Sequence, residues 1–238
     1  MIIVIMSKII GIIVLLFSIF TSTCYDVNSN DNEMKDARRE IKYLALGDSY
    51  TIGESVDPAF RWPVQLVDRL KKDSINIADA DIIARTGWTT DELMRGIETV
   101  KPGNDYDLVS LLIGVNNQYR GRDIYNFREE LVDLIDIAIR SAVDLADNVI
   151  VLSIPDWGVM PFASGRDKDK IAEEIDAFNN VVKEECSYAG IKFFDITEIS
   201  RHAAYDPSLI AVDGLHPSGK MYGLWVDEIY SHVYEILK

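Results

Sequence analysis

Cysteine and histidine are scarce in this sequence. The 238 residues include only two cysteines, Cys24 and Cys186, and three histidines. A disulfide framework needs more cysteines, and a zinc site needs a cluster of cysteine, histidine or carboxylate ligands, so neither is expected. Cys186 continues an apolar face with helical spacing over residues 171–182. That pattern predicts a buried thiol on a helix.

Positive charge is also in short supply. The chain has 24 Lys and Arg residues against 39 Asp and Glu residues, a net charge of -15, and no basic cluster offsets it. Such a surface repels a polyanion, so no nucleic acid partner is expected. The patterns G-x-G-x-x-G and G-x-x-x-x-G-K-[ST] of dinucleotide and nucleotide sites are absent as well, and we expect no cofactor.

A long hydrophobic run occurs only at the N-terminus. After Lys8, twelve uncharged and mostly apolar residues run from Ile9 to Phe20. This is shorter than the roughly 20 residues of a membrane span and typical of a signal-peptide core. Residues 1–23 are therefore predicted to be a signal peptide. If translation starts at Met6 and not at Met1, "MSK" supplies the basic segment before the core.

Cys24 follows the small residues "TST" and resembles the lipidated first residue of a bacterial lipoprotein, although Thr21 stands where an aliphatic residue is usual. Lipidation would place the protein at the cell envelope, and a lipid anchor is the one membrane contact that we expect. Ordinary secretion and an uncleaved anchor are the alternatives. The polar residues 24–40 are predicted to form a flexible tether.

From residue 41 onward, strand-like runs alternate with helical patterns. The runs are "IKYLAL", "ADIIA", "YDLVSLLI", "NVIVLSI" and "IKFFDI". Between them lie amphipathic segments such as residues 124–145, whose predicted buried face carries Phe127, Leu131, Leu134, Ala138, Ala142 and Leu145. This alternation predicts one α/β domain over residues 41–238, with a parallel sheet covered by helices on both faces.

Candidate site residues follow several of these expected strands. Ser49 follows the first, Gly87 the second and Asn116 the third, while Asp213 and His216 precede the last helix. Ligands bind at the carboxyl ends of parallel strands, so these residues should meet there. A serine nucleophile needs an imidazole base, the imidazole needs an orienting carboxylate, and the oxyanion needs N–H donors. All of these groups are present.

Four short blocks in this order resemble the motifs of the GDSL, or SGNH, hydrolases. They are "GDSY" at 47–50, the glycine at 87, "GVNN" at 114–117 and "DGLHP" at 213–217. The resemblance covers the whole domain. It implies a flavodoxin-like three-layer α/β/α sandwich with a five-stranded parallel sheet, and a carboxylic ester hydrolase.

The same resemblance implies a role for each residue. Ser49 would be the nucleophile and also donate its backbone N–H to the oxyanion hole. Gly87, through its backbone, and Asn116, through its amide, would be the other two donors. His216 would be the general base and Asp213 its orienting partner.

The chain departs from the family pattern at two positions. Tyr50 replaces the leucine of "GDSL", a position expected to pack, and Asn117 replaces a common aspartate, which puts a charge-based role there in doubt. Asp48 is expected to hold the nucleophile loop by hydrogen bonds. His202 lacks a carboxylate at comparable spacing, and His232 is expected to edge a packing face.

Substrate preference is predicted from residues near the expected site. Trp88, Arg120 and Trp157 are the substrate-binding candidates, and Arg122 and Arg166 lie in the same loops. The strands and helices account for the domain, which leaves no long apolar insertion for a lid or acyl tunnel. We therefore expect a short acyl ester, such as an acetyl group on a carbohydrate.

Three alternatives remain open at this point. A lysophospholipase or thioesterase of the same family would use Arg120 and Arg122 for an anionic substrate. A catalytically silent, carbohydrate-binding lipoprotein would keep the fold without the reaction. A flavin- or nucleotide-binding module on a flavodoxin-like sheet is the main reading outside the hydrolases, although it leaves "DGLHP" unexplained.

Overall fold

The structure is a computed structural model that describes residues 39–238. The predicted signal peptide, Cys24 and most of the predicted tether lie outside the described residues. Within this range, the first sheet-like contact is a bridge between Ile41 and Ile77. No helix of the described part is long and apolar enough to cross a membrane.

Five parallel strands form one sheet in the order β2-β1-β3-β4-β5. They are β1 (Tyr43–Gly47), β2 (Asp81–Ala84), β3 (Leu108–Leu112), β4 (Val149–Leu152) and β5 (Lys192–Phe194). Each strand corresponds to one of the five runs expected from the sequence. All residues of the three inner strands are buried, because helices cover both faces of the sheet.

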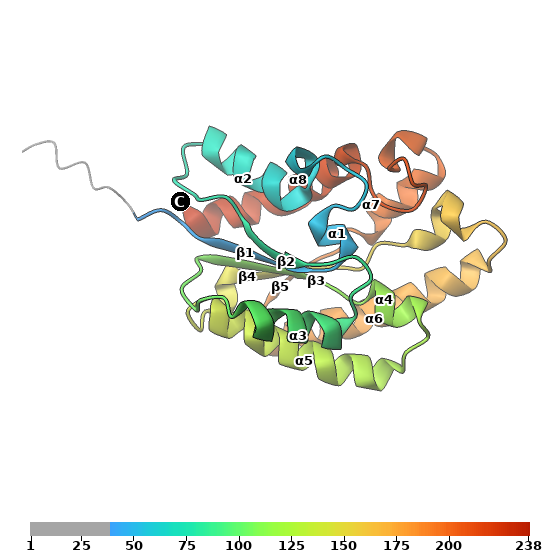
Figure 1. Cartoon of the computed structure of the whole chain (residues 1–238), viewed down its shortest axis with the longest axis horizontal. Helices are drawn as coiled ribbons and strands as arrows, with labels where there is room; N and C mark the ends of the chain where they lie inside the picture. Colours follow the sequence, from blue (N-terminus) through green and yellow to red (C-terminus); the bar gives the residue numbers. More distant parts are fainter. Residues whose placement is uncertain (1–38) are drawn as a thin grey trace, which may run out of the picture. The chain divides into compact units, whose positions relative to one another are not determined.

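The helices form a layer on each face of the sheet (Figure 1). One layer consists of α1 (Ser49–Ile52), α2 (Trp62–Lys72), α7 (Thr197–Arg201) and α8 (Gly219–Leu237). The other consists of α3 (Thr90–Val100), α4 (Val115–Tyr119), α5 (Ile124–Ser141) and α6 (Lys168–Ala189). Short 3-10 helices η1 to η6 span Pro58–Phe60, Ala146–Asn148, Trp157–Val159, Pro161–Ala163, His202–Ala204 and Pro207–Leu209. This is the predicted three-layer α/β/α sandwich.

The helix predicted over residues 124–145 ends earlier than expected. α5 stops at Ser141, and Val143 and Asp144 follow with φ angles of 57° and 58°. These left-handed conformations cannot continue a right-handed helix. Leu145 is 53% exposed, so its assignment to the buried face of the helix was wrong. The apolar spacing in the sequence continues beyond the end of α5. Side-chain periodicity alone does not reveal that the backbone changes direction after Ser141.

Cys186 lies fully buried on α6, as predicted. Burial raises the pKa of its thiol to about 12. The thiol is therefore a packing group and stays protonated at neutral pH.

The sheet order creates a crevice at one point. From β1 the chain passes to β2 on one side, and later enters β3 on the other side. The loops that follow β1 and β3 therefore diverge, and the opening between them at the carboxyl ends of the strands is where ligands bind in such sheets. Ser49 and Asn116 lie in the short helices α1 and α4, which follow these two strands.

Candidate active site

Ser49 lies at a tight turn from β1 into α1. Asp48 caps α1, and its carboxylate accepts a hydrogen bond of 3.0 Å from the Tyr50 N–H. At Gly47 the backbone passes so close to its neighbours that a Cβ atom would lie 2.2 Å from the Thr51 hydroxyl oxygen. Only glycine fits there. The turn leaves Ser49 as the first residue of the helix, with 5% of its surface exposed.

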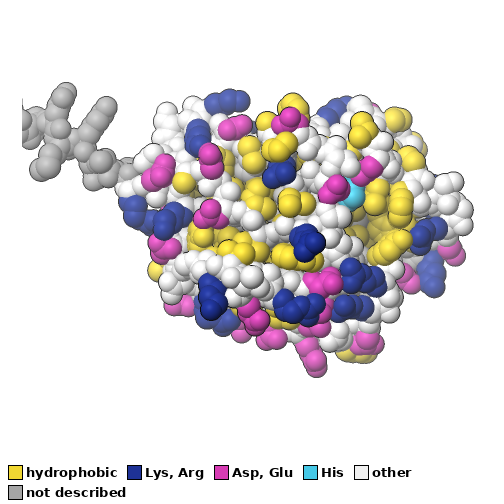
Figure 2. All heavy atoms as spheres, in the orientation of Figure 1, with side chains coloured by type: hydrophobic (Ala, Val, Ile, Leu, Met, Phe, Trp, Pro, Cys, Tyr) yellow, Lys and Arg dark blue, Asp and Glu magenta, His cyan; other side chains and the backbone are white. Residues whose placement is uncertain are grey.

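A cavity of about 170 Å³ brings together four of the residues predicted for catalysis and for the oxyanion hole. Ser49, Gly87, Asn116 and His216 all line it. Its other lining residues are Tyr50, Thr86, Val115, Tyr119, Trp157, Phe162 and Leu215. Figure 2 shows a histidine beside a hydrophobic patch, on the side of the molecule where α1 and α4 lie in Figure 1.

The Asp213 carboxylate forms a hydrogen bond with the His216 ring at Nδ1. Its Oδ2 atom lies 2.6 Å from His216 Nδ1 and accepts from the Ser55 hydroxyl at 2.7 Å. Its Oδ1 atom accepts from the backbone N–H groups of Leu215 and His216 at 2.9 and 3.0 Å. Partial burial acts to raise the pKa of Asp213, but these hydrogen bonds outweigh it and hold the pKa well below its usual range. The ionised carboxylate fixes the proton on Nδ1, so that Nε2 is the acceptor.

Three N–H donors border the cavity near Ser49. Neither the Ser49 N–H nor the Gly87 N–H donates to another described residue. The Asn116 amide donates to the Trp88 carbonyl at 2.9 Å, and its contact with Asp48 Oδ2 is long, at 3.5 Å. One amide hydrogen therefore fixes the side chain and the other is weakly engaged. Such a set of donors is what a developing oxyanion requires.

The two arginines expected to meet an anionic substrate are engaged elsewhere. Arg120 donates to the Gly87 carbonyl at 2.6 Å and lies 3.4 Å from Glu92. Arg122 pairs with Asp91 at 2.7 Å. Neither arginine lines the cavity. Arg120 instead holds the loop that carries Gly87.

Of the two tryptophan candidates for substrate binding, only Trp157 lines the cavity. Its indole N–H donates to the Gln118 side chain at 2.8 Å. The Trp88 ring packs so tightly on α3 that a Cβ atom on Gly96 would lie 2.2 Å from it. Sequence proximity placed Trp88 near the site, but its side chain points to the helix.

Asn117 has a structural explanation. It is fully buried; its side-chain oxygen accepts from the Thr90 N–H at 3.1 Å and its amide donates to the Thr90 hydroxyl at 2.6 Å. That hydroxyl gives its own proton to Glu130. A carboxylate at position 117 would have no hydrogen to offer the hydroxyl oxygen, whereas the amide does. Asn117 thus ties the loop after β3 to the start of α3.

The remaining histidines lie away from the cavity. His202 is exposed in η5, and His232 packs against Phe194 with ring centroids 5.5 Å apart. Burial lowers the pKa of His232. Among residues 39–238, no group of three or more His, Cys, Asp or Glu side chains is arranged to hold a metal ion.

Tyr50 packs as expected, and it also borders the cavity. Its ring makes edge-on contacts with Trp225 and with His216, at centroid distances of 6.3 and 5.8 Å. Tyr119, Thr86 and Leu215 are lining residues that the sequence analysis missed. Thr86 and Tyr119 lie outside the quoted motifs, and Leu215 lies in the "DGLHP" block, where no role was assigned to it.

Asp48 is a buried carboxylate whose environment disfavours its charge. Burial raises its pKa to about 7, although the hydrogen bond that it accepts from the Tyr50 N–H acts to lower the pKa. Because the folded-state pKa lies above the unfolded value of 3.8, the stability that Asp48 contributes is full at low pH and is lost as pH rises through about 7.

We expect Asp48→Asn to stabilise the fold more at alkaline pH than at acidic pH. An amide keeps the capping oxygen but cannot ionise, so the gain in free energy of unfolding should be about 2–3 kcal/mol larger at pH 8 than at pH 5. Urea unfolding at the two pH values measures it. Asp57→Asn is the matched control, because Asp57 caps η1 through the Ala59 N–H but is exposed. An equal gain at both pH values would contradict the prediction.

Comparison with known proteins agrees with this geometry. The sequence model of the GDSL-like Lipase/Acylhydrolase family matches residues 45–224. No curated protein sequence matches significantly.

Solved structures share the fold at low sequence identity. TesA is 17% identical, with a TM-score of 0.65 over 82% of this chain and 99% of that chain. The lipase/acylhydrolase from Enterococcus faecalis is 22% identical, with a TM-score of 0.63 over 83% and 97%. Axe2, an acetylxylan esterase from Geobacillus stearothermophilus, is 20% identical, with a TM-score of 0.61 over 81% and 94%. With the family match spanning most of the domain, the chain belongs to the GDSL-like lipase/acylhydrolase family.

Proposed function

We propose that this protein is a serine esterase that hydrolyses short acyl esters through Ser49, His216 and Asp213. The observation that carries the proposal is the cavity that holds Ser49 together with a His216 ring paired with an ionised carboxylate. A flavin- or nucleotide-binding role does not account for this pairing. Membership of the family also favours a hydrolase.

The reaction would proceed in two steps. The Ser49 hydroxyl attacks the ester carbonyl carbon while His216 Nε2 takes its proton, and Asp213 stabilises the resulting imidazolium. The N–H groups of Ser49 and Gly87 and the Asn116 amide stabilise the tetrahedral oxyanion. His216 then gives the proton to the leaving alcohol. Water attacks the acyl-enzyme by the same route, and the carboxylic acid leaves.

The size of the cavity supports a short acyl group. Its volume of about 170 Å³ lies below the roughly 300–1,000 Å³ of pockets that enclose drug-sized ligands. A long acyl chain gains only about 0.8 kcal/mol per buried methylene, and only where apolar surface covers it. An acetyl group on a carbohydrate fits the proposal, and a long-chain lysophospholipase or thioesterase is the competing candidate.

A series of nitrophenyl esters from two to twelve carbons tests this choice. We expect kcat/KM to be greatest for acyl groups of two to four carbons, because longer acyl chains would extend beyond the cavity and be exposed to water. The measurement is initial rate against ester concentration for each chain length. A steady rise with chain length would contradict the short-acyl proposal and favour the lipid-directed alternative.

We also propose that the protein is exported and anchored through a lipidated Cys24. In a host that processes lipoproteins, the wild-type protein should partition with membranes and carry no residue before Cys24. Cys24→Ser should release the protein or leave it unprocessed. Fractionation and N-terminal mass analysis measure this. A soluble wild-type protein cut at another residue would instead indicate ordinary secretion.

A further inference from the structure

An aromatic cluster forms one wall of the cavity. It consists of Tyr119 at the end of α4, Trp157 in η3 and Phe162 in η4. The ring centroids are 5.3 Å apart for Tyr119 and Trp157, 6.1 Å for Trp157 and Phe162, and 6.3 Å for Tyr119 and Phe162. Tyr119 and Phe162 are each 44% exposed, so the cluster extends from the cavity to the surface.

Arg166 lies over this aromatic cluster. Its guanidinium carbon is 5.1, 5.2 and 5.7 Å from the ring centroids of Tyr119, Trp157 and Phe162, which are cation–π distances. One guanidinium N–H donates to the Tyr119 hydroxyl at 3.1 Å. The Arg166 backbone N–H donates to the Ala163 carbonyl at 3.0 Å, which fixes the loop. The cation is therefore held in place before any ligand arrives.

Arg166 has no carboxylate partner among the described residues. This distinguishes it from Arg120 and Arg122, which are paired with Glu92 and Asp91. The contrast matters because the chain carries 39 acidic residues and a net charge of -15. A negatively charged surface disfavours anionic substrates, so a substrate anion needs a specific unpaired cation close to the reaction.

We propose that Arg166 binds an oxyanion, a carboxylate or phosphate, on the alcohol portion of the ester substrate. The guanidinium uses one N–H for the Tyr119 hydroxyl. Most of its N–H groups therefore remain to bind an oxyanion in a bidentate manner. This inference rests on the proposed function, since it assumes that the ester reacts at Ser49.

The position of Arg166 indicates that the anion belongs to the alcohol portion of the ester and not to the acyl group. Ser49 and the acyl-binding space lie inside the cavity, whereas Arg166 is exposed beyond the aromatic cluster and does not line the cavity. In the proposed reaction a short acyl group occupies the cavity beside Ser49, which leaves the alcohol portion to extend toward the surface. The aromatic cluster lies between the two.

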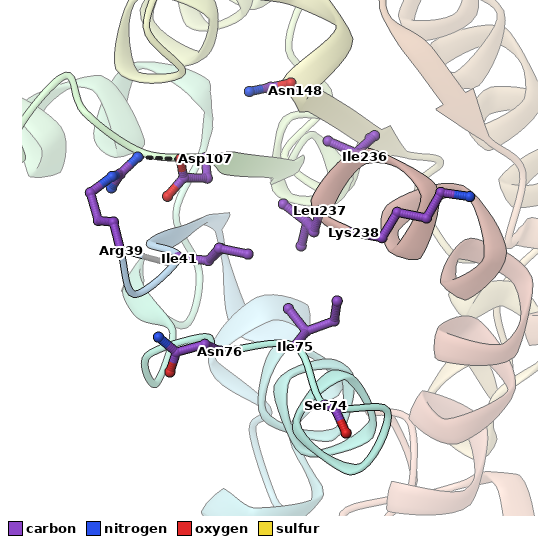
Figure 3. A pocket seen from close by; sticks show the side chains of 10 residues that line it. All are labelled: Arg39, Ile41, Ser74, Ile75, Asn76, Asp107, Asn148, Ile236, Leu237 and Lys238. Carbon is purple, nitrogen blue, oxygen red and sulfur yellow. Dashed lines mark hydrogen bonds and ion pairs between the residues drawn. The ribbon is translucent and has the colours of Figure 1, made fainter. Parts of the chain in front are cut away.

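The cavity at the opposite ends of the strands has no comparable chemistry. The cavity drawn in Figure 3 is larger, about 310 Å³, and lies at the amino ends of the strands, away from Ser49. Its charged side chains include Arg39 and Asp107, which pair with each other at 2.5 Å. It contains no histidine and no free cation over aromatic rings.

Two matched substrate pairs test the inference. One pair is an acetylated methyl glucoside and the corresponding methyl glucuronide; the other is acetylated glycerol and acetylated glycerol phosphate. The readout is the ratio of kcat/KM for the anionic ester to that for its neutral partner. We expect wild type to favour the anionic ester of one pair, which identifies the anion as carboxylate or phosphate, and the preference to weaken as salt concentration rises.

In Arg166→Gln the ratio of kcat/KM for the anionic ester to kcat/KM for the neutral ester should fall by about tenfold, as expected for the loss of a charge-assisted hydrogen bond. Lys168→Gln is the matched control, because it removes the same charge two residues away and Lys168 makes no contact with the aromatic cluster. Its ratio should stay at the wild-type value. A wild-type ratio without anionic preference, or the same ratio in Arg166→Gln, would overturn the inference.

Binding separates failure of this inference from failure of the proposed function. Turnover of the neutral esters tests the esterase alone. If no ester is hydrolysed, titration with methyl glucuronide and with glycerol phosphate, followed by tryptophan fluorescence, still tests the anion site, because Trp157 lies 5.2 Å from the guanidinium. Saturable binding to wild type that is lost in Arg166→Gln would support the site. Absence of binding to wild type would refute it.

Discussion

If Ser49 is the nucleophile, its replacement by alanine should lower kcat by about a million-fold, as removal of the nucleophile does in subtilisin. Among the described residues that line the cavity, Ser49 is the one serine. The Thr86 hydroxyl, which also lines it, donates to Glu54. Its side chain makes no hydrogen bond with another described residue, so the variant should fold normally. An unchanged melting temperature would verify this point.

Covalent labelling provides the direct measurement. An organophosphonate probe should add its mass to the peptide that contains Ser49 in wild type and add nothing in Ser49→Ala. Ser55→Ala is the matched control, because Ser55 is the nearby hydroxyl that contacts Asp213, and it should still be labelled. Labelling that persists in Ser49→Ala would refute the assignment. A wild-type protein that is neither labelled nor active would favour the catalytically silent binding protein.

Replacement of Asp213 by asparagine should lower kcat by about ten-thousand-fold. The two oxygens of Asp213 have separate partners, which makes this change informative. Oδ1 accepts from the backbone N–H groups of Leu215 and His216, and an asparagine oxygen preserves those contacts. Oδ2 faces His216 Nδ1, where an amide would place a donor. The ring would then carry its proton on Nε2, the atom that accepts the Ser49 proton in the proposed reaction.

The pH profile distinguishes this tautomer effect from a loss of structure. Because a histidine base must be neutral, wild-type kcat/KM should rise from acidic to alkaline pH. Asp213→Asn should remain nearly inactive over the same range while keeping its melting temperature. Ser55→Ala, which removes only the second contact to Oδ2, should lose less than about tenfold in activity. A similar large loss in both variants would mean that the turn, and not the carboxylate, is what matters.

Local patterns in the sequence were sufficient to predict the fold and to suggest the pairing of Asp213 with His216. The five strand runs and their alternation with helices predicted the parallel sheet, because side-chain periodicity reports which faces are buried. Asp213 and His216 lie three residues apart, and their hydrogen bonds form within one turn. Such a pairing can be anticipated from spacing alone. Cys186 was predicted to be buried for the same reason.

Contacts between distant segments were decided only by the tertiary structure. Arg120 meets Glu92 and Arg122 meets Asp91 across about thirty residues of chain, so the sequence could not show that both cations are already paired. Arg166 appears equally charged in the sequence, yet it lies over three rings from α4, η3 and η4 without a carboxylate partner among the described residues. Whether a charge is available to a substrate depends on which groups folding brings within a few ångströms of it. Local composition does not contain that information.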